Sequence, residues 1–235
     1  MSHIEYRIEN KYIVSDSTLA VIAGRLSAVM RQDIHQTGDC YEIRSIYFDD
    51  IGDHCMDEND AGIDCRQKYR IRTYGPELSQ LNLEIKSKQN GMTNKTTCPL
   101  TAAEYSAILS GGNSLCFGSK KPLNRLLLQM RTAGMRPKVV ITYERTAFVH
   151  PAGNVRITFD RNIMANRDCN AFFDRHMAGS IPILPTGMHV LEVKYDEFLP
   201  DAIAKQLEIG KLQQSAFSKY YLGRLAVNGE FPVIP

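Results

Sequence analysis

Arginine, lysine and glutamate recur at every second position in several segments of the chain. Arg70 and Arg72 are two residues apart, and so are Glu192 and Lys194. Successive side chains of a β-strand point to opposite faces, so the two members of each pair would lie on one face. A guanidinium can hold two phosphate oxygens at once, and an ammonium acts as a point charge. Faces rich in these cations and poor in carboxylates therefore favour the binding of linked phosphates.

The same kind of face recurs from one end of the chain to the other. Its charged positions are Arg7, Glu9, Lys11, Arg70, Arg72, Glu84, Lys86, Lys88, Arg145, Arg156, Asp160, Glu192 and Lys194. Charged strand residues ordinarily face solvent. Here the opposite positions are apolar, and the predicted helices carry apolar stripes that need a surface to cover. If the helices pack on the apolar side, the charges point inward around a channel. Two cations at ~6 Å repel by roughly 3 kcal/mol, so such a channel needs solvent or a bound polyanion.

Alternation with a period of two predicts eight strands that position these charges. The strands are expected at 4–14, 41–49, 66–74, 81–89, 92–99, 136–149, 154–161 and 187–196. Asn90-Gly91 predicts a hairpin turn between the fourth strand and the fifth. Apolar stripes with capping signals predict the helices. They are expected over 17–31 behind an Asp16/Ser17 cap, after the Thr101–Glu104 capping box, after Pro122, after Pro200, and around Phe217–Leu225.

The order of these elements indicates one α+β domain over residues 1–235. No internal repeat, linker or change of composition divides the chain. A largely antiparallel sheet of eight strands fits the pattern, and eight is about the number at which a sheet closes around a small interior. The 235 residues are 43% apolar, which is enough for a sizeable core.

Composition excludes several classes of protein. The net charge of +2 is not the signature of a general nucleic-acid binder. Apolar runs are too short to span a bilayer, and Met1–Glu5 lacks the features of a secretory signal. The six cysteines are scattered, with no C-x-x-C pair and no histidine placed to complete a zinc site. We therefore expect reduced thiols and a cytoplasmic location.

Eight short motifs, in their order and strand placement, carry a resemblance to a known family. The motifs are Arg7–Tyr12, Ser45–Asp49, Tyr69–Gly75, Leu83–Lys88, Tyr143–Phe148, Val155–Asp160, Leu191–Tyr195 and Phe217–Tyr220. Each is weak alone, and together they cover essentially the whole chain. They resemble the triphosphate tunnel metalloenzyme (CYTH-like) superfamily, and more closely the polyphosphate polymerase domain of the vacuolar transporter chaperone (VTC) family.

The resemblance implies an eight-stranded antiparallel β-barrel, the triphosphate tunnel, with helices packed outside. The basic residues that match the catalytic phosphate-binding positions are Lys11, Arg70, Arg72, Lys86, Arg145 and Arg156. The further matches to substrate-binding positions are Lys95, Lys194, Ser218 and Lys219. Glu192 matches the ligand of Mn²⁺ or Mg²⁺, and Glu9 is a second candidate. The wider superfamily begins with Glu-x-Glu-x-Lys. Arg7 stands at the first of these positions here, which leaves fewer carboxylates for a two-metal hydrolytic site.

The activity implied is that of a polyphosphate polymerase, which transfers the γ-phosphoryl of a nucleoside triphosphate, with ATP expected, to a growing polyphosphate chain. The acceptor is already an ionised phosphate, so no general base is needed. Two alternatives stay open: a metal-dependent tripolyphosphatase or nucleoside triphosphatase, and a non-catalytic polyphosphate-binding module. The expected partners are ATP and inorganic polyphosphate, without nucleic acid or membrane insertion. Export would require a separate membrane-protein partner, and the oligomeric state is left open.

Structural roles are the alternative for some of these residues. Glu9 could pair with Arg7 or Lys11 to balance the charge of an empty tunnel, and Glu84 could balance Lys86 in the same way. The Ser218–Lys219 pair could be the exposed start of a helix. In each case a structural role predicts pairing or exposure, whereas a functional role predicts a charge presented to a ligand.

Overall fold

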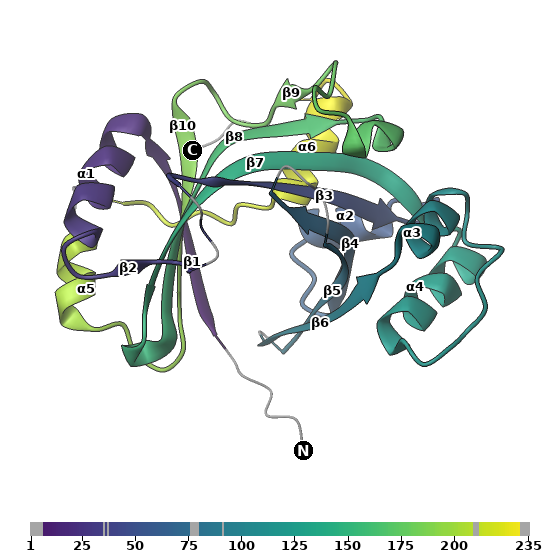
Figure 1. The fold of residues 1–235 in the computed structure, drawn as a ribbon, viewed down its shortest axis with the longest axis horizontal. Coiled ribbons are helices and arrows are strands. Elements are labelled where there is room, and N and C mark those ends of the chain that lie inside the picture. The colour runs from purple at the N-terminus through teal and green to yellow at the C-terminus, as the bar shows by residue number, and fades with distance from the viewer. Residues whose placement is uncertain are drawn as a thin grey trace. The chain divides into compact units, whose positions relative to one another are not determined.

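The computed structural model describes residues 7–34, 36, 38–75, 80–90, 92–208 and 212–230 (Figure 1). The chain contains two compact units, which are considered one at a time. Unit 1 consists of Met1–Glu42, Tyr143–Ile163 and Leu184–Ser218. Unit 2 consists of Ile43–Thr142, Met164–Ile183 and Lys219–Pro235. That the whole chain is one domain stays a prediction.

Eight long strands follow one another in an antiparallel sheet. Their order is β1 (Ile8–Ser15), β10 (Met188–Tyr195), β8 (Val155–Asn166), β7 (Arg136–His150), β3 (Tyr41–Asp49), β4 (Arg66–Tyr74), β5 (Leu81–Gln89) and β6 (Met92–Leu100). These ranges agree closely with the predicted strands, except that β8 ends five residues later than predicted; residues 4–6 of the first predicted strand lie outside the described residues. Two short strands were not predicted, namely β2 (Arg31–Gln32), which pairs with β7, and β9 (Ile181–Pro182), which pairs with β8.

Helices complete an α+β fold, as predicted. The α-helices in the described part of the chain are α1 (Asp16–Leu26), α2 (His54–Asp60), α3 (Ala102–Leu109), α4 (Lys121–Thr132), α5 (Asp201–Leu207) and α6 (Lys219–Val227). Short 3-10 helices lie at Ala152–Asn154 and Cys169–Phe173. Within the described residues, no helix has both the length and the apolar character needed to cross a membrane.

In unit 1 the helices cover the apolar face of the sheet. Leu19, Ile22 and Leu26 form the buried stripe of α1. They share one core with Ile203 of α5, and α1 and α5 lie side by side (Figure 1). The strand residues in this core are Val14, Phe148, Val155, Ile157, Phe159, Leu191 and Val193. Because side chains alternate along a strand, the charged positions of β1, β8 and β10 lie on the opposite face.

Unit 2 repeats this arrangement with other elements. Ile46, Ile71 and Leu83 are directly opposite one another on β3, β4 and β5, and all three are fully buried. Helix α4 packs against β5 and β6, and its buried stripe is Leu123, Leu126, Leu127 and Met130. The charged positions of β4 and β5 again fall on the other face. The prediction that helices cover the apolar side holds within each unit.

Helix caps agree with the sequence in one case and differ in another. Thr101 and Glu104 form the predicted capping box at the start of α3. The N-cap of α1 is Ser15, one residue before the predicted cap, and its hydroxyl accepts from the Thr18 amide at 3.3 Å. At the β5–β6 turn Asn90 has φ = 53°, as a tight hairpin turn requires, and Gly91 lies outside the described residues.

Replacement of glycine by alanine is expected to change the free energy of unfolding in opposite directions at two helical positions. A Cβ on Gly24, exposed in α1, would meet open space, so Gly24→Ala should raise the free energy of unfolding by about 0.5–1 kcal/mol through helix propensity. A Cβ on Gly223 in α6 would lie 2.2 Å from Cδ1 of the fully buried Ile141. We therefore expect Gly223→Ala to lower it by about 1–2 kcal/mol. Urea unfolding measures the free energy of unfolding of both variants. A change in the same direction in the two variants would contradict this packing.

Candidate functional site

Two lysines and two glutamates form a compact cluster on the charged face of unit 1. In the register of β1 and β10, Lys11 is opposite Glu192 and Glu9 is opposite Lys194, so all four side chains share one face. Lys11 Nζ lies 3.0 Å from Glu9 Oε1, and Lys194 Nζ lies 3.0 Å from Glu192 Oε1. Lys194 also lies 3.5 Å from the other oxygen of Glu9. Each of the two carboxylates also affects the pKa of the other.

Both carboxylates of this cluster are held in the ionised form. Burial would raise the pKa of Glu192, but Lys194 and Lys11 outweigh it and hold the pKa well below its usual range. Burial and Glu192 also act to raise the pKa of Glu9, and the same two lysines bring it below its usual value. Two adjacent ionised carboxylates are hard oxygen donors of the kind that Mg²⁺ and Mn²⁺ accept.

The cluster can supply part of a coordination sphere. No group of three or more His, Cys, Asp or Glu side chains in the described ranges is placed to hold a metal ion. Mg²⁺ usually takes one or two carboxylates and fills its other positions with water and phosphate oxygens. Glu9 and Glu192 fit this requirement, and an ion shared with a phosphate ligand suits them better than a permanently enclosed ion.

Arg145 is the most firmly held cation on this face. Its Nε and one terminal nitrogen donate to the two oxygens of Asp160 at 2.6 and 2.7 Å. Its other nearby carboxylate is Glu192, at 3.7 Å. Burial would lower the pKa of Arg145, but Asp160 raises it well above the usual value. Arg145, on β7, is therefore a fixed cation between Asp160 of β8 and Glu192 of β10.

Arg156 lies on the same face, directly opposite Lys194 in the register of β8 and β10. One guanidinium nitrogen forms a short ion pair with the buried Asp33, and the other donates to the Tyr41 hydroxyl at 3.2 Å. The side chain keeps about a third of its surface exposed. Asp33 thus holds Arg156 in place although the side chain is only partly buried.

In unit 2, Glu84 is the centre of a second charged cluster. It is opposite Arg70 in the register of β4 and β5, and Arg70 Nε donates to it at 2.7 Å. Arg72 lies 3.7 Å away, and Lys95 Nζ lies 3.3 Å from the other carboxylate oxygen. Lys86 is directly opposite Lys95 on β6, so it belongs to the same face. Burial would raise the pKa of Glu84, but Arg70, Arg72 and Lys95 hold it far below its usual value.

Hydroxyl groups on β3 extend this second cluster. Arg70 donates to the Tyr47 hydroxyl at 3.0 Å, and Arg72 donates to Ser45 Oγ at 3.1 Å. Burial would raise the pKa of Tyr47, but Arg70 and Arg72 outweigh it and lower the pKa below its usual value. Lys219, the first residue of α6, adds to this lowering of the Tyr47 pKa. Its ammonium therefore belongs to the electrostatic surroundings of the Tyr47 phenol.

The structure thus brings the predicted residues together in two groups, one in each unit. Unit 1 contains Glu9, Lys11, Arg145, Arg156, Glu192, Lys194 and Ser218, and unit 2 contains Arg70, Arg72, Lys86, Lys95 and Lys219. Ser218 follows Phe217, whose carbonyl oxygen accepts from Lys11 at 3.1 Å. The assignment of catalytic, substrate-binding and metal-binding roles to these residues stays a prediction.

Sequence reasoning assigned no role to Asp160 or Asp33, which hold Arg145 and Arg156. Asp160 carried a usable signal, because it shares the alternation of Arg156 and Thr158 on β8. Asp33 gave no such signal, since it lies just after the two-residue strand β2, outside any predicted strand. Sequence reasoning also assigned no functional role to Tyr47, whose ring is buried and whose hydroxyl contacts Arg70.

Glu84→Gln tests whether the second cluster depends on its central charge. The variant leaves three cations around a neutral amide, and we expect a loss of about 3 kcal/mol in the free energy of unfolding at neutral pH. The folded-state pKa of Glu84 is lowered from 4.5, so its contribution is complete above about pH 4.5 and is lost as the pH falls further. Urea unfolding should therefore show a constant difference in free energy of unfolding between the wild type and the variant from about pH 5 to 8. This difference should narrow in more acidic buffers. A difference of the same size at about pH 3 would contradict this role.

Comparison with solved structures supports the fold. A candidate adenylate cyclase from Bacillus halodurans superposes with a TM-score of 0.53 at 14% sequence identity, covering 90% of this chain and 94% of that one. The Mimivirus capping enzyme triphosphatase gives a TM-score of 0.38 at 12% identity, covering 86% of this chain and 85% of that one. The first likeness establishes a shared fold and leaves the activity open. No curated protein matches the chain.

Comparison with protein families is more specific. The model of the VTC domain matches residues 6–228, which is nearly the whole chain. The match includes the strands that carry the two charged clusters, so the resemblance inferred from the ordered motifs is confirmed. The chain belongs to the VTC domain family.

Proposed function

We propose that this VTC domain is a polyphosphate polymerase that uses a nucleoside triphosphate, with ATP expected, as its phosphoryl donor. The observation that carries the proposal is the cluster in unit 1, where the ionised Glu9 and Glu192 lie among Lys11, Lys194 and Arg145. Carboxylates for a divalent ion and cations for phosphate oxygens are thus on one sheet face. Chains of linked phosphates with bound Mg²⁺ or Mn²⁺ need both.

The reaction requires positioning and charge neutralisation and no proton transfer. A terminal phosphate oxyanion of the growing chain attacks the γ-phosphorus, and the bond to the β–γ bridging oxygen breaks. The electrons of that bond leave with the nucleoside diphosphate, so the charges balance without a general base. A divalent ion held by Glu9 and Glu192 would neutralise phosphate charge. Arg145 and Arg156 would hold nonbridging oxygens, with Lys11 and Lys194 as point charges.

The cluster in unit 2 would bind phosphates without a metal. Arg70, Arg72, Lys86 and Lys95 lie around the single carboxylate Glu84, so this face keeps an excess of positive charge. Because Glu84 already orients the Arg70 guanidinium, an incoming phosphate finds its donor in place. The expected ligand of this face is a run of phosphates, consistent with a polymeric product.

Incubation of the purified chain with ATP and Mn²⁺ tests the proposal. We expect long polyphosphate on a gel, with nucleoside diphosphate formed in step with it. Glu192→Gln should raise the Mn²⁺ concentration for half-maximal activity by on the order of tenfold or more. Glu144→Gln is the matched control, because Glu144 lies in the same unit and accepts from Asn162 instead of a cation.

Other products would contradict the polymerase. Free phosphate without chains would indicate a hydrolase, and binding of polyphosphate without turnover would indicate a binding module. An unchanged Mn²⁺ dependence in Glu192→Gln would remove Glu192 from the metal site.

Lys95→Ala tests the unit 2 face with little structural disturbance. About half of the Lys95 side chain is exposed, and Glu84 keeps its arginine partners in the variant. We expect tripolyphosphate affinity to fall about fivefold, or ~1 kcal/mol, with a nearly unchanged Tm. Lys121→Ala is the control, since Lys121 is an exposed cation on α4, the helix that packs against the apolar face. Equal losses in the two variants would indicate unspecific attraction to positive charge.

A further inference from the structure

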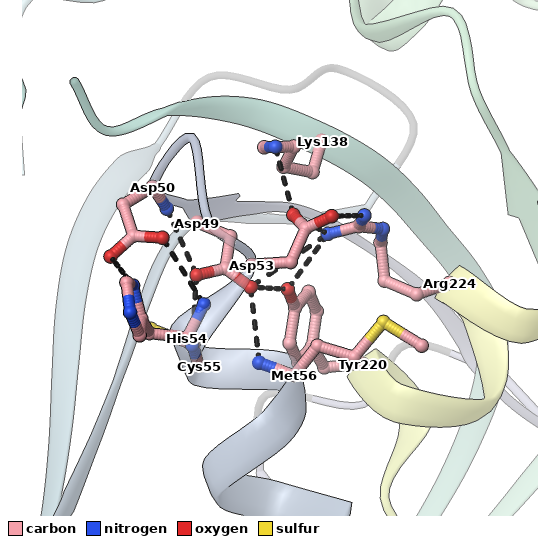
Figure 2. A network of polar contacts seen from close by, with 9 residues as sticks. All are labelled: Asp49, Asp50, Asp53, His54, Cys55, Met56, Lys138, Tyr220 and Arg224. Atoms are coloured by element: carbon pink, nitrogen blue, oxygen red, sulfur yellow. Dashed lines mark hydrogen bonds and ion pairs between the residues drawn. The ribbon is translucent and has the colours of Figure 1, made fainter.

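A buried polar network in unit 2 ties α6 to the corner between β3 and α2 (Figure 2). Asp49, the last residue of β3, is fully buried and accepts backbone N–H groups from Asp50, Cys55 and Met56 at 2.9, 2.9 and 3.1 Å. Its fourth donor is the hydroxyl of Tyr220, which comes from α6. A buried carboxylate with four donors is a fixed point of the structure, because loss of any donor leaves charge unsatisfied.

A second carboxylate holds the same face of α6. Arg224 is one helical turn after Tyr220 and donates to both oxygens of Asp53 at 2.9 Å, and to the Tyr220 hydroxyl at 3.0 Å. Lys138 of β7 also donates to Asp53, at 2.8 Å (Figure 2). These partners lower the pKa of Asp53 to about 2. The start and the middle of α6 are therefore both attached to the β3–α2 corner.

The network continues into the charged cluster through an aromatic contact. The rings of Tyr220 and Tyr47 have their centroids 5.4 Å apart. Tyr47 in turn accepts from Arg70, the principal partner of Glu84. Lys219 immediately precedes Tyr220 at the start of α6. Tyr220, which donates to Asp49, is therefore adjacent to Lys219 in the chain and in ring contact with the phenol that meets Arg70.

We propose that Tyr220 and Arg224, held by Asp49 and Asp53, are positioning residues that fix Lys219 and the Tyr47 phenol beside Arg70. They would then determine how tightly the unit 2 face binds linked phosphates. Neither residue touches the ligand, and their effect is transmitted through Lys219 and Tyr47. The inference deepens the proposed function and rests on it, because it assigns the bound anion to the same cluster.

The chemistry explains why a rigid helix start matters here. A lysine ammonium is a flexible point charge on a four-carbon stem, so it gains affinity when its backbone is fixed near the ligand. The hydrogen bond to Asp49 fixes Tyr220, the residue directly after Lys219. It therefore holds the N-terminal end of the helix, and helix ends tend to fray. A role limited to stability would lower Tm without a specific dependence on Lys219. These two roles are therefore separable by experiment.

A double-mutant cycle with inorganic tripolyphosphate, read by titration calorimetry, provides the test. Tyr220→Phe keeps the ring contact with Tyr47 and removes the hydroxyl. We expect it to weaken tripolyphosphate binding about fivefold in the wild-type background, and by less than twofold when Lys219 is already alanine. Tyr221→Phe is the matched control, because the neighbouring phenol pairs with Asp60, outside the network, and its binding should not change.

Each outcome decides the question. Equal weakening in both backgrounds, or a lowered Tm with unchanged affinity, would overturn the positioning role while leaving the proposed function intact. Absence of tripolyphosphate binding by the wild-type chain would overturn the proposed function, and this inference with it. If Tyr220→Phe does not fold, Arg224→Lys replaces it in the same cycle, since it keeps the charge and loses the two-point contact with Asp53.

Discussion

The structure depends on the pairing of strand cations with buried or half-buried carboxylates. A face that carries several arginines and lysines would repel itself, and the cost in a poorly solvated setting rises quickly as the charges approach. Here Asp160 pairs with Arg145, Asp33 pairs with Arg156, and Glu84 pairs with Arg70. The helices can then occupy the apolar faces, because the charged faces are stable without them.

In the proposed function, the same pairing would prepare the charged faces for a phosphate ligand. A guanidinium held at two points has already lost most of its side-chain freedom, so a phosphate that binds it does not have to order it again. Arg145 and Arg156 differ in this respect. Arg145 is almost fully covered and chelated by Asp160, whereas about a third of the Arg156 side chain is exposed. Arg156 is therefore better placed than Arg145 to exchange its carboxylate for a phosphate.

Alternation along the strands made most of the fold predictable. A period of two is unambiguous over nine residues, as in Arg66–Tyr74, so strand limits and the membership of each face followed directly. The β2 and β9 strands have two residues each, too few to show a period. Helix α2, with the sequence HCMDEND, lacks an apolar stripe and follows a left-handed Asp53, so no local pattern predicted it.

The charged faces were predictable from the same alternation. The residues that pair with their charged side chains were not predictable. Spacing along the strands is enough to predict a charged face that carries Arg70, Arg72 and Lys86. The contacts of Asp49 and Asp53 with α6 join residues 171 positions apart. Spacing along the chain does not single out Asp49 from the five acidic residues between it and Asp64 as the one that contacts Tyr220 of α6. Such long-range pairs depend on how the elements pack, which spacing along the chain does not encode.

Diffraction from crystals soaked with Mn²⁺ and tripolyphosphate would test the proposed metal site most directly, by the anomalous signal of the metal. We predict an ion in direct contact with Glu9 and Glu192 that shares a phosphate oxygen, with further phosphate oxygens on the neighbouring cations. Mn²⁺ confined to exposed acidic residues such as Asp57 and Asp64, with Glu9 and Glu192 still occupied by their lysines, would contradict it.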